Sequence, residues 1–219
     1  MLLAVSSTSE TQSRGWRARV LTLRLISEVA SNGGRDPAVR RLIVPLSLNG
    51  CGVRDISRVL GVSPNTVLKL LRQQTAAVPD ARLPERLRDL QVDELWSFVQ
   101  SKERQAWLWY AFEPDSKQIV AWTLGRRTDE SCARLLKQLE KCHVLRFCTD
   151  DWESYEKLVP AAHHWMGKHW TQEIERQNLN FRTHLKRPHR KTICYSKSLE
   201  MHEAVIKLYI HQHNCQHQL

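Results

Sequence analysis

The 219-residue chain lacks the features that mark membrane, secreted and zinc-binding proteins. No stretch reaches the roughly 18 consecutive apolar residues of a membrane-spanning helix, so no membrane partner is expected. The start, MLLAVSSTSETQ, has no basic segment and too short an apolar run for a secretory signal peptide. None of the six cysteines belongs to a Cys-x-x-Cys pair. We therefore expect reduced thiols in a cytoplasmic protein, with no evident zinc site.

Acidic residues are also in short supply. The chain has 23 Asp and Glu against 33 Lys and Arg, which gives a net charge of +10 and a pI of about 9.6. Such an excess favours a polyanionic partner, with nucleic acid first. Hydrophobic residues make up 42% of the chain, enough for a core. The length allows one large domain, or a medium domain with a small one.

Residues 1–35 are poorly patterned and stay unassigned, whereas residues 36–74 predict a small helical DNA-binding domain. Two apolar stripes meet at Gly61-Val62-Ser63, and Ser63-Pro64 is a typical helix start. This is the pattern of a helix-turn-helix, whose second helix enters the major groove of DNA. The alternative is an ordinary helical hairpin with a solvated basic face. The outward residues of the second helix, expected to contact DNA, would be Asn65, Thr66, Lys69 and Arg72.

Residues 75–91 contain two prolines and alternating charges, and are expected to be a linker. Residues 92–214 then alternate between strand-like and helix-like runs: three strands in a meander, a helix, a fourth strand, and later helices. This is the order of a ribonuclease-H-like fold. The prediction is therefore an α/β domain with a mixed sheet, preceded by the all-α domain and followed by a short tail, 215–219.

Carboxylates stand at three places that this fold would bring together. Asp150 comes after the apolar run 144–148 and Thr149, Asp93 opens the first strand, and a late helix carries Glu173 and Glu175. Each acid taken alone could be a turn or cap residue, for which Asp is common. In a ribonuclease-H-like fold, however, the first strand, the fourth strand and a late helix each supply one carboxylate to a common site. Clustered carboxylates need a counter-charge, and oxygen ligands suit Mg²⁺ or Mn²⁺.

The segments VDELWSFV, CTDDWESY and TQEIERQNLNFRTHL, followed by SKSLEMHEAVI, resemble the transposase of the insertion-sequence-one family. The resemblance covers roughly residues 36–211. It implies a DDE transposase that cuts DNA at the ends of its element and joins the freed 3′ hydroxyls to target DNA. The catalytic and metal-binding acids implied are Asp93, Asp150 and Glu175, with Mg²⁺ or Mn²⁺ as the cofactor.

The resemblance also implies DNA contacts and an assembly. Arg182, seven residues after Glu175, stands where related transposases often place a basic residue that touches DNA. The run HLKRPHRK, which contains Lys186 and Arg187, is expected to contact phosphate, the alternative being a solvated turn. Chemistry on two double-stranded DNA ends implies a homo-oligomer at the nucleoid. A DNA-binding repressor without catalysis, and a nuclease that cuts without joining, remain alternatives.

Both ends of the chain raise separate expectations. The family usually has a Cys-rich zinc-binding module at its amino terminus, but no cysteine precedes Cys51 here. This suggests an altered start that weakens binding to the element ends, which translation of the upstream DNA in all frames would test. The run HQHNCQH (211–217) has no known zinc-ligand spacing, and is expected to be a disordered polar tail.

Overall fold

The structure, a computed structural model, describes residues 36–80 and 82–217, and its first elements are three short helices. The unassigned segment 1–35 lies outside the described residues. Asp36 caps the first helix by accepting a hydrogen bond from the Ala38 amide (2.8 Å), and Ser63 caps the third through the Thr66 amide (3.1 Å). Gly61 ends the second helix with φ of 64°, a left-handed conformation that glycine adopts without strain. The helices are α2 (Pro37–Leu48), α3 (Val53–Leu60) and α4 (Pro64–Ala76).

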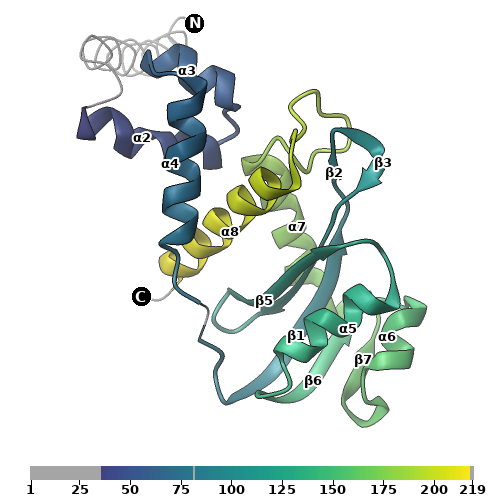
Figure 1. The fold of residues 1–219 in the computed structure, drawn as a ribbon. Helices are drawn as coiled ribbons and strands as arrows, with labels where there is room; N and C mark the ends of the chain where they lie inside the picture. Colours follow the sequence, from purple (N-terminus) through teal and green to yellow (C-terminus); the bar gives the residue numbers. More distant parts are fainter. Residues whose placement is uncertain (1–35, 81, 218–219) are drawn as a thin grey trace, which may run out of the picture.

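A five-stranded sheet in the order β5-β4-β1-β6-β7 forms the centre of the remaining chain (Figure 1). Strand β1 pairs antiparallel with β4, β4 pairs antiparallel with β5, and β6 and β7 continue parallel to β1. This mixed sheet confirms the ribonuclease-H-like α/β fold predicted from the order of elements. Its strands are β1 (Arg86–Leu95), β4 (Trp107–Glu113), β5 (Gln118–Gly125), β6 (His143–Thr149) and β7 (His164–Met166). A separate two-stranded ribbon, β2 (Phe98–Val99) with β3 (Ser101–Gln105), lies between β1 and β4 in the chain.

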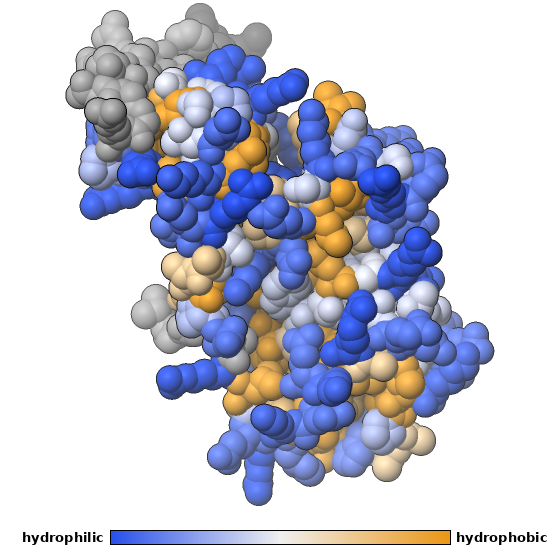
Figure 2. All heavy atoms as spheres, viewed as in Figure 1, coloured by the Kyte–Doolittle hydropathy of each residue, from blue (hydrophilic) through white to orange (hydrophobic). Residues whose placement is uncertain are grey.

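Helices cover both faces of the sheet. One hydrophobic core includes buried residues of α5 and α6 with one face of the central strands, and the other includes residues of α7 and α8 with the opposite face. Hydrophilic residues cover most of the molecular face drawn in Figure 2, with hydrophobic patches between them. The helices are α5 (Asp129–Gln138), α6 (Glu153–Leu158), α7 (Gln172–His184) and α8 (Leu199–Gln216), with single 3₁₀ turns at Ala161–His163 and Lys168–Trp170.

The three amino-terminal helices pack on α8. The buried residues of α2, α3 and α4 belong to the same hydrophobic core as α7, α8 and one face of the sheet. At the margin of this contact, Arg72 of α4 forms an ion pair with Glu200 of α8 (2.6 Å). The Thr75 hydroxyl donates to the Ala204 carbonyl (3.3 Å). The helix-turn-helix and the sheet domain are therefore joined by packing as well as by the chain between them.

Two expectations about segment ends were wrong. Strand β1 begins at Arg86, so the second part of the expected linker is strand. Residues 211–216 are not a disordered tail, because α8 continues to Gln216. There the Asn214 side chain accepts from the Ile119 amide (2.9 Å) and donates to the Ile119 carbonyl (2.8 Å), which fastens the helix end to β5.

The structure also bears on two features noted in the sequence, the cysteines and the lack of long apolar stretches. All six cysteines lie in the described part of the chain and are free thiols. Within that same part, every helix is too short or too polar to cross a membrane.

Candidate active site

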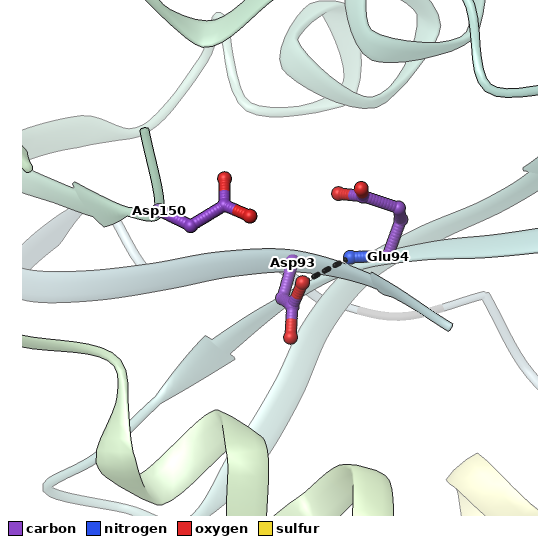
Figure 3. A group of neighbouring side chains, drawn as sticks. All are labelled: Asp93, Glu94 and Asp150. Atoms are coloured by element: carbon purple, nitrogen blue, oxygen red, sulfur yellow. Dashed lines mark hydrogen bonds between the residues drawn. The ribbon is translucent and has the colours of Figure 1, made fainter. Parts of the chain in front are cut away.

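The first two predicted acids meet at adjacent ends of β1 and β6. In the parallel pairing of these strands Gln91 is opposite Cys148, and two residues later come Asp93, within β1, and Asp150, directly after β6. Asp93, Glu94 and Asp150 each offer a carboxylate oxygen, and these oxygens lie within 4.8 Å of one another. Figure 3 shows Asp93 and Glu94 pointing to opposite sides of β1, with the Asp150 carboxylate directed toward them. The structure therefore brings two of the three predicted acids together.

Two N–H donors hold the Asp93 carboxylate. Oδ1 accepts from the Glu94 amide (2.7 Å), and Oδ2 accepts from the Asn178 side chain (2.6 Å). Burial nevertheless raises the pKa of Asp93 to about 6, and the charges of Asp150 and Glu175 act in the same direction, while the two hydrogen bonds lower it. The two hydrogen bonds therefore do not offset the effect of burial on the pKa of this carboxyl.

Helix α7 is fixed against β1 and β4 by polar contacts that place Asn178. The Tyr110 hydroxyl donates to Asn178 Oδ1 (2.9 Å), and the Ile174 amide donates to Gln91 Oε1 (2.7 Å). Glu175, in the first turn of α7, is exposed and lies outside the 4.8 Å group, although its charge acts on Asp93. The third predicted acid thus lies beside the site, but its carboxylate is not among the clustered ones in this structure.

Glu94 is the member of the group that sequence reasoning missed. Alternation along β1 places it on the face opposite Asp93, and for that reason it was not a candidate. Its side chain is only 3% exposed, forms an ion pair with Arg127 (2.6 Å) and accepts from the Tyr155 hydroxyl (2.8 Å). Burial, followed by the Asp93 charge, raises its pKa to about 7. The sequence feature that could have identified Glu94 is a second acid directly after the first on a buried strand.

The donor set fits a hard divalent cation. It consists of carboxylate oxygens alone, and Asp93 and Asp150 are both partly accessible from outside. No other group of three His, Cys, Asp or Glu side chains in the described residues has ligand atoms this close, and the histidines near the carboxyl end do not form one. The described residues thus contain one candidate metal-binding cluster, which includes two of the three predicted acids.

Two family models match the chain. The model described as "IS1 transposase" matches residues 89–216, more than half of the chain, and the model described as "InsA C-terminal domain" matches residues 30–74. The chain belongs to the IS1 transposase family. This confirms the resemblance noted in the sequence, and the second model confirms the helix-turn-helix in front of the catalytic core.

Individual relatives agree with this assignment. The insertion element iso-IS1n protein InsB of Shigella dysenteriae is 50% identical over 123 residues, which are 56% of this chain and 94% of that protein. The insertion element IS1 9 protein InsB of Escherichia coli K12 is 39% identical over 145 residues, 66% of this chain and 87% of that protein. Among solved structures, the HTLV-2 integrase catalytic core domain in complex with magnesium matches 59% of this chain and 86% of its own, with 15% identity and a TM-score of 0.36.

The residues of α4 that were predicted to contact DNA differ from one another in their surroundings. On α4, Asn65 and Lys69 are exposed, and the Thr66 hydroxyl lies 2.9 Å from that of Ser63. Arg72, on the same helix, is already paired with Glu200. The amino-terminal part of α4 is thus the part open to a ligand.

The basic candidates after Glu175 differ in the same way. Burial, then the charge of Arg190, lowers the pKa of Arg182, whose buried Nε has no hydrogen-bond partner within the described residues. The Lys186 side chain is exposed and runs beside Gly50, between α2 and α3. Arg187 is partly buried and donates to the Ser196 hydroxyl (3.0 Å).

Proposed function

We propose that this chain is a DNA transposase that cleaves the ends of its element and transfers the freed 3′ hydroxyls into target DNA. Asp93, Asp150 and Glu175 hold Mg²⁺ or Mn²⁺ in this proposal. The observation that supports it best is the meeting of the Asp93 and Asp150 carboxylates at adjacent strand ends, beside the α7 turn that carries Glu175. Membership of the IS1 transposase family supplies the reaction class.

The residues of this chain have separate tasks in that reaction. Asn178 and the Glu94 amide orient the Asp93 carboxylate, one oxygen of which lies within 4.8 Å of an Asp150 oxygen. Bound divalent ions would activate an attacking oxygen and stabilise charge at phosphorus. Arg182, whose side chain is partly buried and close enough to Asp93 for the two charges to interact, is proposed to contact a DNA phosphate beside that acid.

Recognition and catalysis are assigned to different units. Residues 36–74 bind double-stranded DNA through Asn65, Thr66 and Lys69, the sheet domain that begins at Arg86 of β1 carries out catalysis, and the segment between α4 and β1 connects them. Lys186 and Arg187, at the start of the loop after α7, were expected to contact phosphate and belong to the catalytic unit. Because the reaction uses two element ends, the active species is a homo-oligomer.

The test is cleavage and joining of a duplex that carries the element's own end, with Mg²⁺ and a target duplex. Asp150→Asn and Glu175→Gln should reduce both products by at least about 100-fold, since loss of a metal ligand should exceed the 10–100-fold typical of residues that only support ligands. Asp151→Asn and Glu173→Gln are matched controls, because each changes an acid nearby. Both controls should keep activity.

Each other outcome has a defined meaning. Full activity of Asp150→Asn would show that the acids are wrongly assigned. Wild-type chain that binds the end without cutting would instead be a repressor. Cutting without joining would indicate a nuclease.

A further inference from the structure

The ribbon β2–β3 and the loop between α7 and α8 form one structural unit, although about 90 residues separate them in the chain. Figure 1 shows them side by side at one end of the sheet. The Gln100 amide donates to the Ser196 carbonyl (2.8 Å), the Gln100 side chain donates to the Lys197 carbonyl (2.9 Å), and Val99 forms a parallel bridge with Ser196. We name residues 98–105 and 186–197 together the basic lobe.

A buried hydrogen-bond chain supports the basic lobe from below. The fully buried His202 of α8 places Nε2 at 2.9 Å from Ser97 Oγ and Nδ1 at 2.9 Å from Ser196 Oγ. The Ser97 hydroxyl donates to the Ala106 carbonyl, so it must accept from His202, and Nε2 therefore carries the proton. Nδ1 then accepts from the Ser196 hydroxyl, which itself accepts from Arg187 (3.0 Å). Every donor in this chain has an acceptor only if His202 is neutral.

The hydrogen bonds through His202 fix the basic lobe relative to the catalytic acids. Ser97 follows Asp93 by four residues at the end of β1. Arg187 follows the end of α7, the helix that carries Glu175, by three residues. Two of the three elements that deliver acids to the site, β1 and α7, therefore continue into the two ends of the same buried network. The lobe cannot shift without disturbing contacts that His202 makes.

The outer surface of the basic lobe carries a large unbalanced charge. The lobe as a whole has seven Lys and Arg residues and one acid, Glu103. Arg187 is the partly buried one of the seven, and the other six are exposed. None of these six forms an ion pair within the part of the chain that the structure describes. The six exposed cations are Lys102, Arg104, Lys186, Arg190, Lys191 and Lys197.

We infer that the basic lobe is a second DNA-contact surface, which holds the sugar–phosphate backbone of a duplex beside the catalytic acids and separately from the helix-turn-helix. Duplex DNA presents a phosphate about every 1.7 Å along its axis. Cations that bind these phosphates release counterions from the DNA, and this release favours binding. Arg187 supports the lobe from inside through Ser196 and is not one of its phosphate ligands. This inference rests on the proposed function, since it needs DNA at the site.

The test measures how DNA affinity of the full chain depends on salt. Two double variants, Lys102→Gln/Arg104→Gln and Arg190→Gln/Lys191→Gln, remove charge from the ribbon and from the loop in turn. Lys137→Gln/Lys141→Gln, which removes two exposed lysines at α5 and just after it, is the matched control. With a labelled duplex of unrelated sequence, the plot of log association constant against log salt concentration has a negative slope. Each lobe variant should make that slope less negative by about 1.8, at roughly 0.9 per phosphate contact. The control should leave the slope unchanged.

The outcomes separate the lobe from the rest of the proposal. If both lobe variants keep the wild-type slope while the wild type cuts element ends, the lobe is not a DNA surface and the proposed function stands. If the wild type neither binds nor cuts DNA, both ideas fail.

Arg187 has its own test. Arg187→Gln and Arg187→Lys should lower the thermal midpoint alike, because lysine cannot reproduce the guanidinium contact to Ser196. A different result would make Arg187 a phosphate ligand instead. In that case Arg187→Lys would keep the wild-type salt dependence of DNA binding, Arg187→Gln would weaken it, and neither would change the thermal midpoint.

Discussion

At the scale of single residues, Glu94 links the strand of the first acid to the loop of the second. Its buried carboxylate pairs with Arg127, whose guanidinium lies 4.7 Å from the centroid of the Trp152 ring. The Trp152 amide in turn donates to Asp150 (3.2 Å). Arg127 therefore compensates a buried charge and also packs on the residue that caps Asp150. Neither contact requires Glu94 to touch a metal.

Replacing Arg127 tests this link. Arg127→Gln leaves the Glu94 carboxylate buried with only Tyr155 as a partner. Breaking a fully buried pair costs about 3–5 kcal/mol, and because the Arg127 side chain is 38% exposed we expect about 1–2 kcal/mol. For a chain of this size that corresponds to a fall of roughly 2–8 °C in thermal midpoint. The exposed neighbour provides the control, Arg126→Gln, and equal midpoints for the two variants would contradict the role given to Glu94.

Residue types in this site could be predicted from the sequence only in part. Asp150 follows from the end of an apolar run, whereas Asp93 was assigned through the family resemblance and lies near the end of a strand that begins earlier than expected. Asn178 and Tyr110 could not be assigned, because their role depends on how α7 lies across β1 and β4, which is a tertiary contact. Glu94 was missed because the alternation of side chains along β1 predicts which face of the sheet a residue lies on, but not which residues it contacts there.

At the scale of elements, α8 holds the ribbon and the α7–α8 loop through His202. Burial lowers the pKa of His202 from its ordinary 6.5 to about 4, and the nearby Arg187 charge acts in the same direction. The unfolded chain therefore binds a proton at this position between pH 6.5 and 4, whereas the folded chain does not. Stability from this residue is complete above pH 6.5 and is lost as the pH falls toward 4.

This gives a pH prediction for His202. The shift from 6.5 to about 4 corresponds to at most about 3 kcal/mol in the free energy of unfolding, at roughly 1.4 kcal/mol per pKa unit. His202→Gln should be less stable than the wild type at pH 7 but should lack this part of the acid sensitivity. Urea unfolding at pH 7 and pH 5 measures it, with the exposed His169→Gln as control. Parallel losses in wild type and His202→Gln would disprove a neutral His202.

Element boundaries followed from pattern except where tertiary contacts decide them. Arg86, Leu87 and Arg88 alternate exposed, buried and exposed, as a strand does, but Pro79 and Pro84 made the segment look like a linker. The end of α8 is polar and carries no helix signal of its own. Its order comes from Asn214 bonding to the edge of β5, which no local pattern reveals.

At the scale of the whole molecule, the helix-turn-helix and the catalytic unit share one hydrophobic core. Leu71 of α4 and Val205 of α8 are both fully buried in it, together with Phe181 of α7. Two domains that merely follow each other along a chain would each have a separate core. We therefore expect the DNA-recognition helix and the helix that carries Glu175 to lose structure together.

Leu71→Ala tests this coupling from the recognition side. Truncating a buried leucine costs about 2–5 kcal/mol, and a shared core spreads that loss to both units. Hydrogen exchange should accelerate at the amides of α4 and also at those of α7, which Leu71 does not belong to. Leu179→Ala, at a position on α7 that is 62% exposed, is the matched control and should leave both helices protected. Faster exchange in α4 alone would mean that the two units are stable independently, because a core that truly spans them cannot be weakened at one end only.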